Sequence, residues 1–136
     1  MNKKWMHYTV GTFLVLLLVV GLTLIIRTVN SDLQLPDLDN ALAERGLELA
    51  KSNGCVACHS LDGGVGIGPT WLGMYGKTET LVDGSTVVVD EDYIIESILR
   101  PDAKQVEGYE KVMVRSFLSG EELQALVEFT RQLAEQ

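Results

Sequence analysis

The chain has 136 residues, a formal net charge of −8 and two cysteines. Eight of its 11 basic residues and all 19 acidic residues follow Arg27, so the part beyond this residue carries a net charge of −11. These totals leave room for one small domain, and they argue against a nucleic-acid-binding protein, which needs a basic surface, and against a secreted miniprotein held together by several disulfides.

The N-terminal region contains an apolar run that is long enough to cross a membrane. Tyr8–Ile26 comprises 19 residues without a charge, and as a helix these residues would span about 28 Å. Lys3 and Lys4 precede the run, and basic residues before a span favour a cytoplasmic N-terminus. We therefore predict a single-pass transmembrane anchor over residues 1–27 in the cytoplasmic (inner) membrane, with the rest of the chain in the periplasm or another extracytoplasmic space.

A cleaved signal peptide is the alternative interpretation of this region. The run is longer than the apolar part of a usual signal peptide, no small-x-small cleavage site occurs between Ile25 and Asp32, and no cysteine follows that could take a lipid. We therefore expect the anchor to be retained. Residues 28–39 lack periodicity and contain Pro36, which predicts an extended linker between the anchor and a globular domain over residues 40–136.

The globular part is expected to begin with an amphipathic helix over residues 40–53. Apolar and polar positions alternate there with the period of a helix, and Gly54 follows as a C-cap, so Cys55 comes directly after the helix end. The apolar side of this helix is formed by Leu42, Leu47, Leu49 and Ala50.

The pentad Cys55-Val56-Ala57-Cys58-His59 has the spacing that attaches haem covalently to a protein. Two thiols separated by two residues can reach the two vinyl groups of one porphyrin, while His59 reaches the iron from the same side. A zinc site would need further ligands, but the sequence has no third cysteine, and its other histidine, His7, precedes the apolar run. A thioredoxin-like redox pair would need a neighbouring βαβ pattern, which the sequence lacks. The pentad therefore predicts one covalently bound haem c.

The remaining elements follow in chain order. A glycine-rich loop over residues 62–68 can approach a flat ring closely. Residues 81–89 predict a small β-hairpin around Asp83-Gly84, which is a strong two-residue turn signal. Asp90 and its two acidic neighbours then open a helix that Pro101 ends, because acidic groups suit a helix N-terminus and proline follows its end. Ser119 and Glu122 form a capping box, and the apolar face of the last helix is formed by Leu123, Leu126, Val127 and Leu133.

The order of these motifs resembles a class I monohaem cytochrome c domain. The segments 81–87, 93–101 and 106–109 (LVDGSTV, YIIESILRP and VEGY) are similar to the cytochrome domain fused to subunit II of some bacterial haem-copper oxidases, and similar domains serve as the monohaem subunit of alternative complex III. The resemblance covers residues 40–133 and implies an all-α class I cytochrome c fold with a small β-hairpin insertion, preceded here by one N-terminal transmembrane helix. The copper-binding half of such a subunit II is absent from this sequence.

The resemblance also implies an axial pair for the iron. Members of this family place a methionine sulfur opposite the histidine, which raises the reduction potential and closes the iron to outside ligands. Met113 lies at the matching position and is the predicted second iron ligand, beside His59. The family usually has proline directly after this methionine, whereas Val114 follows here. Met74 is the competing candidate, and a large apolar contact is its expected role.

Three further residues receive roles from the resemblance. Pro69 matches the family proline whose carbonyl accepts the second ring N–H of the iron-bound histidine, which fixes the ring orientation. Trp71 is predicted to lie at the cofactor, and either Trp71 or Tyr75 could bond a haem propionate through its polar tip, with plain packing as the alternative. The last helix is expected to cross the first helix of the globular domain, over residues 40–53, near Gly46, with Phe129 at the crossing.

These motifs predict an electron-transfer protein and not an enzyme, with no catalytic residue and no small-molecule substrate, since electron transfer requires no bond making by the protein. Its expected partners are the lipid bilayer and redox proteins, which are subunits of a membrane complex in a respiratory or photosynthetic chain. Two alternatives stay open. One is a haem-based gas sensor or haem enzyme with a labile sixth ligand, and the other is a subunit in which haem only stabilises the fold.

Overall fold

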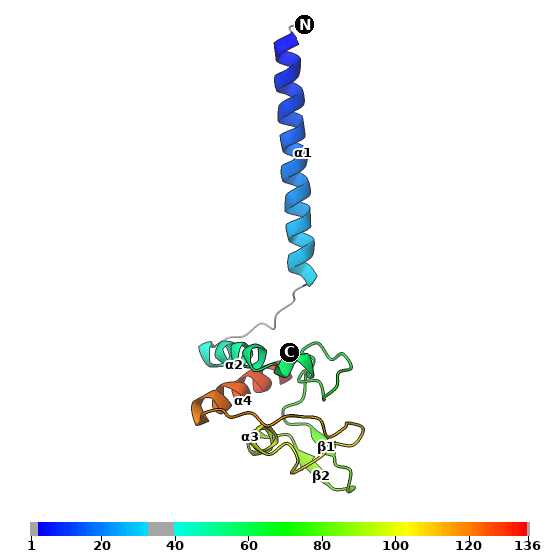
Figure 1. The fold of residues 1–136 in the computed structure, drawn as a ribbon, viewed down its shortest axis with the longest axis vertical. Coiled ribbons are helices and arrows are strands. Elements are labelled where there is room, and N and C mark those ends of the chain that lie inside the picture. Colours follow the sequence, from blue (N-terminus) through cyan, green and yellow to red (C-terminus); the bar gives the residue numbers. More distant parts are fainter. Residues whose placement is uncertain (1–2, 33–39, 136) are drawn as a thin grey trace. The chain divides into compact units, whose positions relative to one another are not determined.

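The computed structural model describes residues 3–32 and 40–135, with side chains in the first helix described for residues 11–26 (Figure 1). The chain forms two compact units, Met1–Leu35 and Pro36–Gln136, and each is treated separately. The first unit contains α1, and the second contains the remaining helices and the strands.

Helix α1 extends over Lys3–Asp32. It continues five residues beyond the predicted anchor end at Arg27, so the expectation of an extended linker was wrong for residues 28–32. These residues contain neither proline nor glycine, and the first proline of the chain is Pro36, so nothing local stops the helix. The rest of the predicted linker, residues 33–39, lies outside the described residues.

The described side chains of α1 are mainly large, apolar and exposed, for example Leu16 at 64% and Leu18 at 73% exposure. Throughout the described parts of the chain, no helix is long and apolar enough to cross a membrane. The predicted transmembrane helix is therefore unconfirmed.

Helix α2 covers Ala41–Ser52, as the amphipathic pattern predicted. The side chain of Asn40 accepts a hydrogen bond from the backbone N–H of Ala43 at 2.8 Å and so caps the N-terminus. Leu47, Leu49 and Ala50 are buried, but Leu42 is 45% exposed, so its assignment to the apolar side was wrong. Ala43, one residue further on, occupies the buried face instead.

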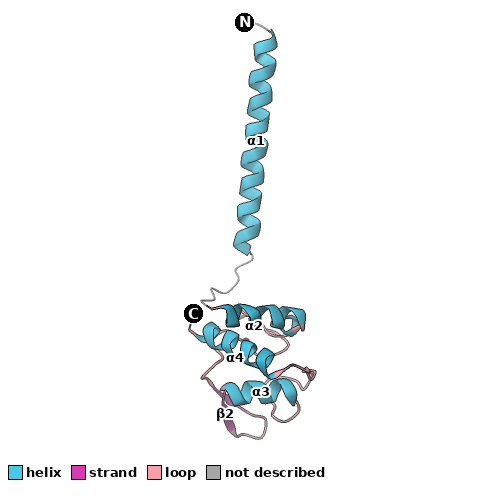
Figure 2. Ribbon diagram, turned by 90° about the vertical axis from the view of Figure 1, so that its left-hand side faces the viewer, coloured by secondary structure: helices cyan, strands magenta, loops and turns pink. Residues whose placement is uncertain are grey.

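Helices α3 and α4 also begin where their sequence signals predicted. Helix α3 covers Glu91–Leu99, with Asp90 as its N-cap. Helix α4 covers Gly120–Ala134 and begins with the complete capping box of Ser119 and Glu122. Figure 2 shows the three short helices α2, α4 and α3 of the second unit, with α4 between the other two.

The closest packing in this unit is the crossing of α2 and α4. A Cβ atom added to Gly46 would lie 2.1 Å from the carbonyl oxygen of Ala125 and 2.6 Å from the Cβ of Phe129. The two helices therefore lie so close together at this point that there is no room for a side chain at position 46. The predicted contact of Gly46 with Phe129 is confirmed, and Phe129 is fully buried there.

The core surrounds this crossing. Phe129, Leu126 and Leu133 of α4 have at most 1% exposure, and burying each such side chain stabilises the fold by about 1.5–3 kcal/mol. The ring of Trp71 packs edge-on against Phe129, with the ring centroids 5.9 Å apart. Other members of the core are Ala50, Val89, Ile94, Ile98, Leu123, Ala125 and Val127.

A two-stranded antiparallel hairpin is present, but its strands differ from the prediction. Strand β1 covers Thr78–Thr80 and strand β2 covers Thr86–Val88. The innermost pair is Thr80 with Thr86, so residues 81–85 form a connection longer than the predicted two-residue turn. Gly84 has φ +82 in this connection, a left-handed conformation that favours glycine.

The hairpin is also tied to the loop that follows α3. Leu81 forms an isolated antiparallel bridge with Val106. The N–H of Val82 donates to the carbonyl of Gln105 at 3.0 Å, and the N–H of Glu107 donates to the carbonyl of Thr80 at 2.9 Å. Leu81 therefore pairs with this distant loop, and it lies outside the paired strands, which end at Thr80 and Thr86.

The helix crossing yields a direct prediction for stability. Replacing Gly46→Ala places a methyl group against backbone atoms of α4, so the helices must separate, and the free energy of unfolding should fall by about 1–3 kcal/mol. Gly120→Ala is the matched control, because a Cβ atom there meets nothing within 4 Å. Chemical denaturation followed by circular dichroism measures both variants, and equal stability of the two would contradict the described crossing.

Candidate functional site

The pentad is wound into one short helical turn directly after α2. Gly54 has φ +74 and ends α2, and the 3-10 helix η1 over Cys55–Ala57 follows. The N–H groups of Cys58 and His59 both donate to the carbonyl of Cys55, at 3.1 and 3.0 Å. In such a turn, side chains three residues apart lie nearly above each other. The thiols of Cys55 and Cys58 therefore share one side of the turn, and neither is in a disulfide.

The orientation of His59 is fixed from two sides. Its Nδ1 lies 2.7 Å from the carbonyl oxygen of Pro69, the contact that the resemblance implied. Its ring stacks on Trp71, with centroids 5.2 Å apart and an interplanar angle of 29°. When Nδ1–H donates to Pro69, Nε2 carries the free lone pair that a metal ligand needs.

The glycine-rich loop approaches the pentad at two points. A Cβ atom at Gly68 would lie 2.6 Å from Cε1 of His59, so the imidazole packs directly on this backbone. A Cβ atom at Gly66 would lie 2.5 Å from the carbonyl oxygen of Cys58. The N–H of Gly68 also donates to that carbonyl at 2.9 Å. At these positions glycine is required by space.

Burial sets the protonation of the site. Desolvation lowers the pKa of His59 below its ordinary value, although the hydrogen bond to the Pro69 carbonyl acts in the opposite direction. The imidazole is therefore neutral at pH 7, the form that binds a metal through a ring nitrogen. Desolvation also raises the pKa of the Cys55 thiol, and the neighbouring Cys58 adds to this effect.

These side chains form one wall of a cavity of about 320 Å³. Cys55, Cys58 and His59 all line it. Much of the remaining lining comes from apolar side chains of the glycine-rich loop, of α3 and of the loop after α3, for example Ile67, Ile94 and Val106. A flat, largely apolar group attached to both thiols would fill such a cavity.

Both candidate methionines also line this cavity. Met113 lies in the segment before α4 and is 40% exposed. Met74 is partly buried and packs against the hydrophobic core. The apolar contact expected for Met74 is therefore present, while Met113 as iron ligand stays a prediction.

The two aromatic candidates differ in their surroundings. Trp71 lines the cavity and is 6% exposed, between His59 and Phe129. Tyr75 is absent from the cavity lining, and its hydroxyl accepts a hydrogen bond from Nη2 of Arg131 at 3.2 Å. Of the pair, Trp71 is thus the residue placed at the cavity wall.

The donor set of the pentad distinguishes haem from a simple metal site. Within residues 3–32 and 40–135, no three His, Cys, Asp or Glu side chains come together in a way that could hold a metal ion. A structural zinc site needs four such donors. Two thiols on one side of a turn and a neutral histidine with Nδ1 engaged instead fit a porphyrin that is bonded through sulfur and ligated through Nε2.

A comparison with protein families decides the identity. The family model for cytochrome c matches residues 43–134, which is more than half of the chain. The chain belongs to the cytochrome c family. No curated protein matches the sequence.

Membership settles the cofactor. Cytochromes c carry haem c attached covalently through a Cys-x-x-Cys-His motif, and Cys55, Cys58 and His59 fit this motif. The haem iron of a cytochrome accepts and releases single electrons. The function class is therefore haem-based electron transfer.

Sequence reasoning missed some residues of the cytochrome cavity. The glycine-rich loop was expected to approach the flat ring of the cofactor, but the specific contact of Gly68 with the imidazole of His59 was not. Tyr93, Lys104 and Gln105 also line the cavity. No local pattern marks Lys104 and Gln105, because the loop that carries them reaches the cavity through its pairing with the hairpin.

The contact between Gly68 and His59 can be tested in this cytochrome. Gly68→Ala should push the imidazole away from Pro69, which should lower the free energy of unfolding by about 1–3 kcal/mol and reduce the low-spin fraction of the ferric haem. Gly64→Ala in the same loop is the control, because its Cβ atom would meet only the flexible carboxylate of Asp62, at 3.0 Å. Optical spectra and denaturation curves measure both. Indistinguishable spectra of the two variants would contradict the described position of His59.

Proposed function

We propose that this cytochrome is a single-pass, membrane-anchored carrier of single electrons in a respiratory or photosynthetic chain. It serves as a subunit of a quinol-oxidising complex or a terminal oxidase, or as a shuttle next to one. Its haem domain faces the periplasm or another extracytoplasmic space, and its N-terminus faces the cytoplasm. Its partners are the lipid bilayer and redox proteins.

One observation carries the electron-transfer part of the proposal. Both thiols and His59 form the wall of one largely apolar cavity. A haem held there would be shielded from water, and burial together with the axial ligands and their hydrogen bonds sets its reduction potential. The residues of the chain itself then take no part in bond making. They hold the ring, orient the imidazole of His59 and exclude water.

The anchor rests on the N-terminal apolar run. Tyr8–Ile26 has 19 residues without a charge, which as a helix would span about 28 Å. Within residues 11–26 the large apolar side chains are exposed, for example Phe13 at 65% and Ile25 at 61%. A bilayer would bury them. A tether also confines the haem domain near the membrane, which raises its effective concentration near integral partners.

Charge substitutions test the anchor in the full-length chain. Changing Leu16→Arg together with Leu18→Arg costs about 2.5–3.5 kcal/mol for each residue at the centre of a membrane helix. We expect the wild-type cytochrome to stay in the membrane pellet after an alkaline carbonate wash, and the double-arginine variant to be released. The matched control is Leu16→Ala with Leu18→Ala, which should stay in the pellet. Release of the wild-type chain by the wash would contradict the anchor.

A second candidate is a haem-based sensor or enzyme with a labile sixth ligand. Two observations favour it, namely the 40% exposure of Met113 and the 78% exposure of Val114 in place of the usual proline. An exposed ligand loop has a low free energy of local opening. The two candidate functions predict opposite behaviour toward carbon monoxide.

Carbon monoxide binding distinguishes these candidates and tests Met113. An electron carrier with Met113 on the iron should resist carbon monoxide when reduced at neutral pH, and Met113→Ala should bind it at once. Met74→Ala is the control and should still resist, because Met74 packs on the core. The absorption spectrum of the reduced protein gives the readout. Immediate binding by the wild type would favour the sensor or enzyme, and binding only by Met74→Ala would reverse the ligand assignment.

A further inference from the structure

The wall of the haem cavity contains a carboxylate that is contributed by the hairpin. Glu79 is the middle residue of β1 and lines the cavity together with the pentad. In each strand the middle residue is less exposed than its two neighbours, and the middle residues Glu79 and Val87 pair directly. Side chains of directly paired residues lie on the same face of a hairpin. The inner face of the hairpin therefore places Glu79 at the cavity.

Glu79 is also the least exposed of the charged groups that the described residues place in this wall, apart from the neutral His59. Lys104, Glu110 and Lys111 line the cavity as well, but all three are exposed, whereas Glu79 is half-buried. Its side chain is 19% exposed, against 39% for that of Lys104. Water and salt screen a partly buried charge much less than an exposed one. The charge of Glu79 should therefore act most strongly on the cavity.

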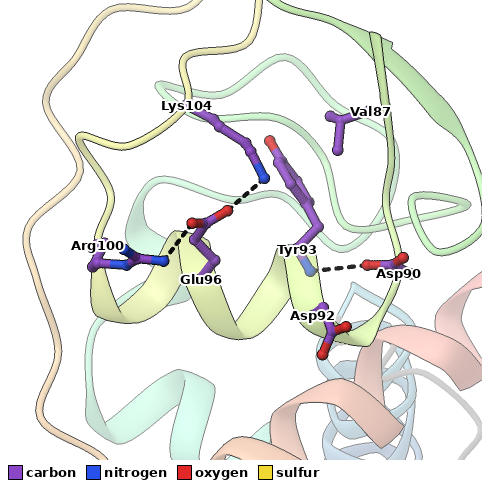
Figure 3. Close-up of a pocket in the computed structure, with 7 residues that line it drawn as sticks. All are labelled: Val87, Asp90, Asp92, Tyr93, Glu96, Arg100 and Lys104. Atoms are coloured by element: carbon purple, nitrogen blue, oxygen red, sulfur yellow. Dashed lines mark hydrogen bonds and ion pairs between the residues drawn. The ribbon is translucent and has the colours of Figure 1, made fainter.

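The ammonium of Lys104 does not offset this charge, because it is paired elsewhere. It donates a hydrogen bond to Glu96 of α3 at 2.5 Å, as Figure 3 shows. This pair lines a surface groove of about 330 Å³ beside the cavity. Among the described residues, three carboxylates and two cations line the groove, and the other two carboxylates are those of Asp90 and Asp92. The groove therefore supplies no excess positive charge to the cavity.

The partner of Glu79 lies outside the cavity. Nζ of Lys77 is 2.9 Å from Oε1 of Glu79, but the side chain of Lys77 is 59% exposed and Lys77 is not part of the cavity lining. The hydrogen bond to Glu79 raises the pKa of Lys77, so the ammonium is charged at pH 7. Solvent screens the exposed ammonium more than the half-buried carboxylate. The ion pair thus has its negative end in the cavity wall and its positive end in water.

The field of this carboxylate extends to a second residue of the wall. Tyr93 lines the cavity from α3. Desolvation raises the pKa of the Tyr93 phenol, and the negative charge of Glu79 adds to this effect. The phenol is therefore neutral at pH 7 and contributes no charge that would compete with that of Glu79.

A negative charge in the cavity wall has an effect of definite sign on the haem. The oxidised iron carries one more positive charge than the reduced iron, so a nearby carboxylate stabilises the oxidised state more. We infer that Glu79 lowers the reduction potential of the haem iron by holding a poorly screened negative charge in the cavity wall. Glu79 acts through space and takes no part in bond making. The inference rests on the proposed electron-carrier function.

Redox titration of the full-length cytochrome with its covalent haem tests the inference. Glu79→Gln keeps the shape of the side chain and removes its charge. At a fixed applied potential, the ratio of oxidised to reduced haem should fall about threefold, which raises the reduction potential by about 28 mV at about 59 mV per tenfold change for a one-electron couple. Glu79→Asp keeps the charge and should shift the potential by less than half as much.

Two further variants separate the local charge from other effects. Glu107→Gln removes one negative charge from an exposed residue outside the cavity lining, whose N–H donates to the carbonyl of Thr80 beside Glu79. This matched control should give less than a third of the shift of Glu79→Gln. Lys77→Met breaks the same ion pair as Glu79→Gln but leaves the carboxylate in place, so the potential should move in the opposite direction.

The outcomes distinguish the role of Glu79 from the function on which it rests. A rise in Glu79→Gln together with a fall in Lys77→Met supports the inference. Shifts of the same sign in these two variants would show that only the loss of the ion pair matters, and equal shifts in Glu79→Gln and Glu107→Gln would show that position does not matter. Either result would overturn the role of Glu79 and leave the cytochrome intact. A wild-type chain without covalent haem would overturn both, and the optical spectrum recorded before titration shows this directly.

Discussion

The hydrogen bonds from Cys58 and His59 to the carbonyl of Cys55 fix the geometry on which the site depends. They wind the pentad into a single turn, so both thiols lie on one side and His59 enters the same cavity. In an extended conformation, neighbouring side chains would point to opposite faces. Two thioether links to one porphyrin require the wound form.

The rest of the second unit keeps this turn in place. The crossing at Gly46 fixes α2 against α4 and so determines where the turn begins. Trp71 connects the site to the core, because its ring contacts both the imidazole of His59 and the core residue Phe129. The position of the iron ligand is thus tied to the packing of the helices, and a change at the crossing should reach the site.

Much of this arrangement could be predicted from short-range signals. The cap of α2, the capping box of α4 and the helix opened at Asp90 all lie where residue chemistry indicated. The pentad specifies its cofactor because no other common site needs two thiols and a histidine at that spacing. The family match over residues 43–134 agrees with this reading.

The missed features depend on contacts between distant residues. Leu81 forms a bridge with Val106 of a distant loop, and the two strands pair over Thr78–Thr80 and Thr86–Val88 instead of closing tightly around Asp83-Gly84. Leu42 fits the helical period but is exposed, whereas Ala43 beside it is buried. Lys104 reaches the cavity only because the hairpin holds its loop. Local pattern carries no information about such pairings.

Mass analysis of the intact full-length chain tests the central claim most directly. After production in a host that matures c-type cytochromes, the denatured polypeptide should weigh more than its sequence by one haem, and a peptide containing Cys55 and Cys58 should carry the added mass. A chain with the mass of the bare polypeptide, whose haem is extracted by acidified organic solvent, would contradict the account.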